Sequence, residues 1–222
     1  MANPDYTLIR GAQGAIAANK VLKNTYLLLA ATLGFSALTA MLSIALAMPP
    51  IAYMGAVIIS MLLGIFVLPK TANSASGIGV IFLITGLLGF GLGAILTQYL
   101  ALPNGPGIIA TAFGGTALIF LGLSGYALTS KRDFSFMGGF IFAGMMVVMV
   151  AVIANIFFAM PALSLAISSA VILLMSAMIL WDTSRIARGE EDNYIMATYS
   201  IYLSIFNLFI SLLQILGIMS DE

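Results

Sequence analysis

Charge-free apolar runs recur along this chain, and each is long enough to cross a lipid bilayer as an α-helix. About 20 helical residues span the roughly 30 Å of hydrocarbon. Seven runs can be placed, at approximately residues 24–48, 51–68, 77–100, 106–129, 136–160, 162–180 and 194–219. They are continuously apolar, whereas a lipid-facing β-barrel strand alternates over about ten residues. The sequence therefore predicts an all-α membrane protein built as a seven-transmembrane-helix bundle.

The basic residues indicate how this bundle is oriented. In a seven-helix arrangement all eight of them fall on one side of the membrane, in the N-terminal segment and in the loops that follow the second, fourth and sixth runs. The loops on the other side are short proline turns without charge. By the positive-inside rule the basic side is the cytoplasm. The N-terminus is therefore predicted to lie inside and the C-terminus outside.

Residues 1–19 do not resemble a cleaved secretory signal, because they carry Asp5 and Arg10 but no continuous apolar core. Glycines, alanines and little apolar periodicity favour a flexible cytoplasmic tail. Residues 20–222 then form the transmembrane domain.

Composition excludes several functions. The chain has no histidine and no cysteine, which rules out Ser-His and Cys-His catalysis and thiolate or histidine metal sites. A formal net charge of zero gives no basic field for nucleic acid. Gly122-Leu-Ser-Gly125 is not a nucleophile elbow, and no second carboxylate in the spans could pair with Asp182 as in an aspartyl protease. We expect no enzyme activity and no cofactor or metal.

Polar residues inside the spans follow helical spacing. One such stripe lies in the last span (Ser200, Ser204, Asn207, Ser211, Gln214) and another in the first (Thr25, Thr32, Ser36, Thr39, Ser43). Together with Asn155 they outline a candidate polar pathway. The alternative is that small hydroxyl residues let helices approach and exchange hydrogen bonds. Gly89 and Gly93 likewise favour a close helix contact, either within the chain or between subunits.

Asp182 is the most informative ionisable residue, because it lies at the cytoplasmic end of the sixth span. A carboxylate partly buried there is a candidate proton or cation gate, with Arg185, Ser204 and Asn207 as its neighbours. The alternative is an ion pair with Arg185 or Arg188 in an interfacial turn. The acidic run Glu190 to Asp192 is either a solvated loop or a docking surface for a partner.

Several segments resemble the Bax-inhibitor family of multispanning proteins, and most closely its bacterial YccA branch. The segments are KVLKNTYLLL from Lys20, GGTAL from Gly114, LTSKRDFSFMGG from Leu128, and Asn193 through Phe209. The resemblance extends over about residues 20–219. It implies a seven-helix bundle in the bacterial inner membrane and, for this branch, association with the membrane AAA protease FtsH and with membrane regulators of that protease. Members of the branch are slow substrates that modulate or inhibit FtsH.

The wider family implies a second function, a pH-sensitive leak for calcium or other cations governed by two facing carboxylates. Asp182 matches the first carboxylate, but Ser204 occupies the position of the second, while Asn207 keeps the asparagine of the pattern. Without a second carboxylate the like-charge coupling of such a pair is lost, which weakens this function. The sequence therefore favours a protease modulator, with the cation leak as the alternative. A structural subunit of a larger complex fits the glycine content equally well.

Overall fold

The fold was analysed in a computed structural model that describes residues 4–130 and 132–220. Its elements are α1 (Pro4–Ala45), α2 (Ile51–Leu62), the π-helical turn η1 (Leu63–Val67), α3 (Leu68–Thr71), α4 (Ala75–Leu100), α5 (Gly105–Ser130), α6 (Met137–Phe158), α7 (Pro161–Ala187) and α8 (Tyr194–Ser220). The segment α2–η1–α3 forms one continuous span. Seven helical stretches are long and apolar enough to cross a membrane, which confirms the predicted number.

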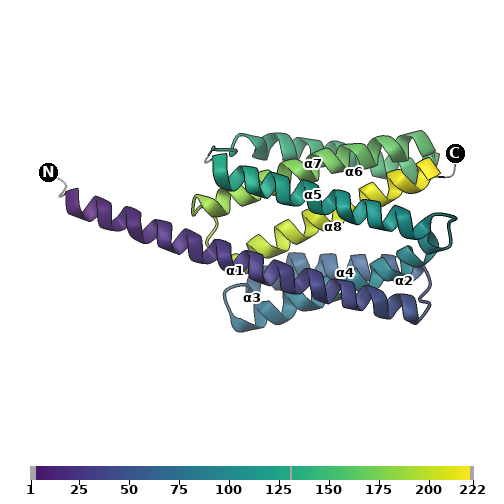
Figure 1. The fold of residues 1–222 in the computed structure, drawn as a ribbon, viewed down its shortest axis with the longest axis horizontal. Coiled ribbons are helices and arrows are strands. Elements are labelled where there is room, and N and C mark those ends of the chain that lie inside the picture. Colours follow the sequence, from purple (N-terminus) through teal and green to yellow (C-terminus); the bar gives the residue numbers. More distant parts are fainter. Residues whose placement is uncertain (1–3, 131, 221–222) are drawn as a thin grey trace.

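The boundaries differ from the sequence prediction at both ends of the chain. α1 begins at Pro4, so residues 4–19 continue the first span as a helix instead of forming an irregular tail, and residues 1–3 lie outside the described chain. Alanines between residues 12 and 18 favour the helix, and proline is tolerated in its first turn. Figure 1 shows the N-terminal part of α1 projecting beyond the bundle. α7 runs on to Ala187, past the predicted end of the sixth span at Leu180.

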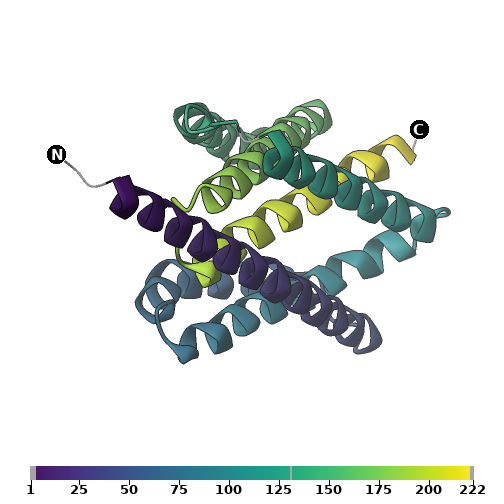
Figure 2. The ribbon, with the colours of Figure 1, turned by 60° about the vertical axis from the view of Figure 1, so that its left-hand side comes forward.

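α8 is the central helix of the bundle. Figure 1 shows it running between α5, α6 and α7 on one side and α1 to α4 on the other, and the rotated view in Figure 2 agrees. Ile201 and Leu208 are fully buried along it, and Tyr202 donates its hydroxyl hydrogen toward the carbonyl of Thr85 in α4. α8 therefore holds the two groups of helices together.

Glycines allow α1 and α4 to pack closely. A Cβ atom at Gly89 would overlap the backbone carbonyl of Ser36, and one at Gly93 would overlap that of Ala40. Only glycine permits backbones to approach so closely without strain. The predicted close contact at Gly89 and Gly93 is thus an internal contact of the bundle.

Candidate functional site

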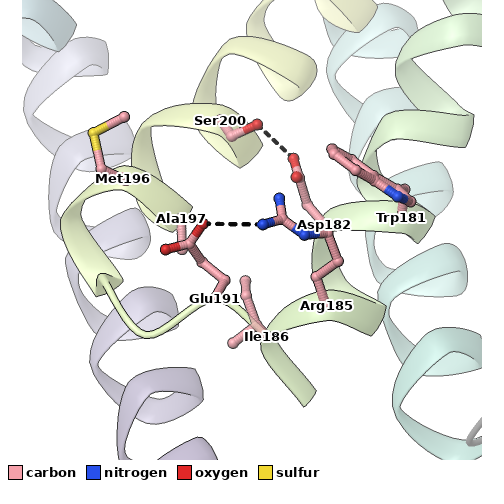
Figure 3. Close-up of a pocket in the computed structure, with 8 residues that line it drawn as sticks. All are labelled: Trp181, Asp182, Arg185, Ile186, Glu191, Met196, Ala197 and Ser200. Atoms are coloured by element: carbon pink, nitrogen blue, oxygen red, sulfur yellow. Dashed lines mark hydrogen bonds and ion pairs between the residues drawn. The ribbon is translucent and has the colours of Figure 1, made fainter. Parts of the chain in front are cut away.

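The candidate gate residues gather around a pocket between the end of α7 and the start of α8, shown in Figure 3. Its volume is about 180 Å³. The lining residues are Trp181, Asp182, Arg185, Ile186, Glu191, Met196, Ala197 and Ser200. In the predicted orientation this pocket lies at the cytoplasmic end of the bundle, where an acidic and a basic side chain meet an apolar wall.

Asp182 lies inside α7 and is only 5% exposed. Ser200 in α8 donates its hydroxyl hydrogen to Oδ2 of Asp182 at 2.6 Å. A hydrogen bond to a charged acceptor is short and strong, and it partly offsets the cost of burying a carboxylate. The neighbour of Asp182 across the helix contact is therefore Ser200.

Ser204, which occupies the family's second carboxylate position, points elsewhere. Its hydroxyl is buried and donates to the backbone carbonyl of Ser200 at 3.0 Å, within its own helix. The expected grouping of Ser204 with Asp182 is replaced by Ser200, one helical turn earlier.

Arg185 faces the same pocket but pairs with a different acid. Its Nη2 lies 3.5 Å from Oε2 of Glu191, and its guanidinium lies 4.6 Å from the ring centre of Trp181. The predicted Asp182–Arg185 ion pair is therefore wrong: within the described residues Arg185 pairs with the acidic loop. Glu191 closes the pocket from the loop side, so this part of the acidic run is not simply solvated.

Arg188 forms a second cytoplasmic cluster, which joins α7 to the loop before α6. It contacts the Asp133 carboxylate and donates to Ser135 Oγ at 2.8 Å and to Glu190 Oε2 at 3.1 Å. Hydrogen bonds from Ser135, together with the contact to Arg188, hold the pKa of Asp133 below its usual range. The hydrogen bond with Asp133 in turn raises the pKa of Arg188. Arg188 is thus held by Asp133 and Glu190, and the predicted pairing with Asp182 is wrong for Arg188 as well.

The candidate polar pathway divides into separate local contacts. In α1, Thr32 donates to the Leu29 carbonyl and Ser36 hydrogen-bonds Tyr202 at 2.7 Å. At the other end of the bundle, Gln214 accepts from Ser168 at 2.8 Å. Asn155 donates to Ser164 at 2.7 Å and accepts from the amide of Met160, so it fixes the turn between α6 and α7.

Two members of the last-span stripe differ sharply in exposure. Ser211 is buried, whereas Asn207 is exposed and donates to the carbonyl of Leu203. Gln214 borders another pocket, of about 240 Å³, that Tyr53 and Gln98 also line. The stripe therefore lies partly inside the bundle and partly on an open face of α8.

Sequence reasoning missed Asn193, which organises the start of α8. Its Oδ1 accepts from the amides of Ile195 and Met196, and its Nδ2 donates to Ala72 and Asn73 in the loop before α4. The missed signal was an asparagine directly before a helix, the residue type preferred as an N-cap. Within the described residues no three acidic side chains come together as a metal site.

Comparison with known proteins identifies the fold's relatives. The family model "Inhibitor of apoptosis-promoting Bax1" matches residues 18–221. A membrane protein of Vibrio cholerae is 50% identical over 222 residues, covering all of both chains. A protein of Pseudomonas aeruginosa is 52% identical over 204 residues, covering 91% of this chain and 90% of its own.

A further relative has a named function. The Escherichia coli K12 protein "Modulator of FtsH protease YccA" is 48% identical over 207 residues, covering 93% of this chain and 94% of its own. A counterpart in another Escherichia coli strain, with the same identity, is named as an inner membrane protein. These matches and the seven spanning helices show that this chain is a multi-pass protein of the bacterial inner membrane and belongs to the Bax inhibitor family.

Proposed function

We propose that this protein is a membrane-embedded modulator of the AAA protease FtsH, that it acts through protein contacts, and that it is itself a slow substrate. The observation that carries the proposal is the 48% identity to the Escherichia coli modulator along 93% of this chain. The proposal includes no catalytic step.

The shape of the chain supports both parts of the proposal. α1 is 42 residues long, about 63 Å at 1.5 Å per residue, and only its segment Ile16–Ala45 is needed to span the membrane. The remainder gives the protease a projecting segment to grip. The bundle behind it is held by close α1–α4 contacts at Gly89 and Gly93, which resist extraction of single helices.

The first experiment is purification of the tagged protein from its native membrane in mild detergent, followed by mass spectrometry. We expect specific recovery of the membrane AAA protease and faster turnover of a reporter substrate when this protein is deleted. Unchanged turnover together with no recovery of the protease would refute the proposal.

The projecting segment can be tested separately. Deleting residues 2–15 spares the span that begins at Ile16, and we expect it to slow proteolysis of this protein by at least about tenfold because the protease loses its grip. Removal of Asp221 and Glu222 at the other end of the chain is the matched control. Equal turnover of the two truncated proteins would exclude the N-terminal segment as the handle.

A cation leak is the second candidate function, and the buried Asp182 beside the cytoplasmic pocket favours it. Asp182→Asn keeps the size of the side chain and removes its charge. In liposomes loaded with a calcium indicator, a leak through this site requires that the variant change the pH dependence of calcium entry. Entry that depends neither on pH nor on this substitution would remove Asp182 from the mechanism.

A further inference from the structure

Asn207 occupies an unusual place for an amide side chain. It lies thirteen residues from either end of α8 (Tyr194–Ser220), which is about 20 Å at 1.5 Å per residue and therefore near the middle of the membrane. It is nevertheless exposed on the surface of the chain. Polar side chains at this depth are costly and normally face the interior of a bundle or a partner.

The hydrogen-bonding capacity of Asn207 is mostly unused. Its carboxamide has two N–H donors and one carbonyl acceptor. One N–H donates to the Leu203 carbonyl at 2.8 Å, and within the described residues this is its sole hydrogen bond. The second N–H and the Oδ1 atom are therefore left to face lipid, where acyl chains offer no partner.

Other exposed polar residues in the spans do not share this problem. Thr111, Thr129 and Ser169 each donate their single hydroxyl hydrogen to a backbone carbonyl four residues earlier, at 2.8–2.9 Å. That bond spends the only donor of a hydroxyl group. The same bond leaves half of the donors of an asparagine unmade, so Asn207 stands apart chemically.

The surroundings of Asn207 form a recess in which α8 is the floor. Ser200 and Gln214 lie seven residues before and after it, on the same helical face, and both bond to α7. On the other flank Tyr199 packs against Gly64 in η1, and Tyr53 of α2 lines the pocket beside Gln214. The face around Asn207 thus lies between α7 and the α2–η1 span.

We propose that this face of α8 docks a single transmembrane helix of the protease partner, which presents a neutral amide or hydroxyl side chain to Asn207. The inference rests on the function proposed above. Flanking spans on both sides of α8 leave room for one helix, about 10 Å wide, rather than for a second seven-helix bundle. The recess carries no charge between Ser200 and Gln214, so the complementary group is neutral. Interhelical hydrogen bonds of this kind stabilise association in membranes.

The test combines a substitution with site-specific photo-crosslinking in native membranes. Asn207→Leu removes the amide, and we expect it to reduce recovery of the protease about threefold to thirtyfold without lowering the thermal stability of the bundle. Ser169→Leu is the matched control, because it replaces an exposed polar residue whose donor is already spent. Asn207→Gln keeps the amide and should restore most of the recovery.

A photo-reactive amino acid at Leu203, one turn from Asn207, should form an adduct with the protease that Asn207→Leu abolishes. The same group at Val147 on α6, a side chain that is 68% exposed, should react with lipid alone. An adduct with a second copy of this chain, or lipid adducts alone at Leu203, would overturn the proposed occupant. Protease recovery that Asn207→Leu leaves unchanged would refute the docking site while leaving the modulator function intact. Failure of the wild-type chain to recover the protease would refute both.

Discussion

α6 and α8 are both long, continuous and apolar, yet they occupy opposite positions in the bundle. Only 6% of the most apolar stretch of α6 is buried, against 56% of that of α8. α6 exposes Phe142 and Phe157 to the membrane, whereas α8 buries hydroxyl residues such as Thr198 and Ser204. In lipid, where all the helices are apolar, small and polar residues mark the interior more clearly than hydrophobicity does.

The largest effect that can break this comparison is the loss of a buried ring from α8. Tyr202→Ala removes a side chain that is 1% exposed and that links α8 to Ser36 in α1 and Thr85 in α4. We expect a cost of about 3 kcal/mol from the cavity and the lost hydrogen bonds. Phe142→Ala, which trims a ring that is 70% exposed on α6, should cost less than about 1 kcal/mol.

Unfolding of the purified protein in mixed micelles measures both variants. Equal losses would show that α6 is packed as tightly as α8, through contacts the single chain does not make.

The sequence was sufficient to predict the spans, because crossing a bilayer imposes length and apolarity on every helix. It did not predict the end of α7. The residues from Trp181 to Ala187 include charged and polar side chains that hydropathy excludes from a span, but nothing in them breaks a helix. The tail prediction failed for a related reason, since low hydrophobicity at residues 4–19 was taken for irregular structure.

The partner of Asp182 could not be derived from spacing. Ser200 and Ser204 lie one helical turn apart on the same face of α8, so both satisfy the pattern. The axial position of α8 against α7 decides between them. That position is fixed by the connecting loop, in which Asn193 caps α8 and binds the loop before α4, a long-range contact that no local pattern reveals.

The outer turn between α6 and α7 sharpens the comparison with a smaller effect. Asn155→Leu removes the bond to Ser164 and the acceptor for the amide of Met160. We expect a cost of about 1–2 kcal/mol. Because α6 packs mainly on α7, faster hydrogen exchange should stay confined to the outer half of this hairpin. Equally faster exchange in α8 would mean that α6 supports the centre of the bundle.

The smallest effect concerns the cytoplasmic end of the same hairpin, where Asp133 and Arg188 join the loop before α6 to the end of α7. The pKa of Asp133 is lowered, so its charged form stabilises the folded state above the ordinary carboxyl pKa of about 4, and this contribution is lost as the pH falls below that value. Asp133→Asn should therefore lower the melting temperature by about 1–2 °C at neutral pH, because the site is exposed and screened by solvent. The difference from the wild-type protein should shrink steadily below about pH 4. Thermal unfolding of both proteins between pH 3 and 7 measures it, and a difference that grows on acidification would show that Asp133 stabilises the hairpin through its protonated form.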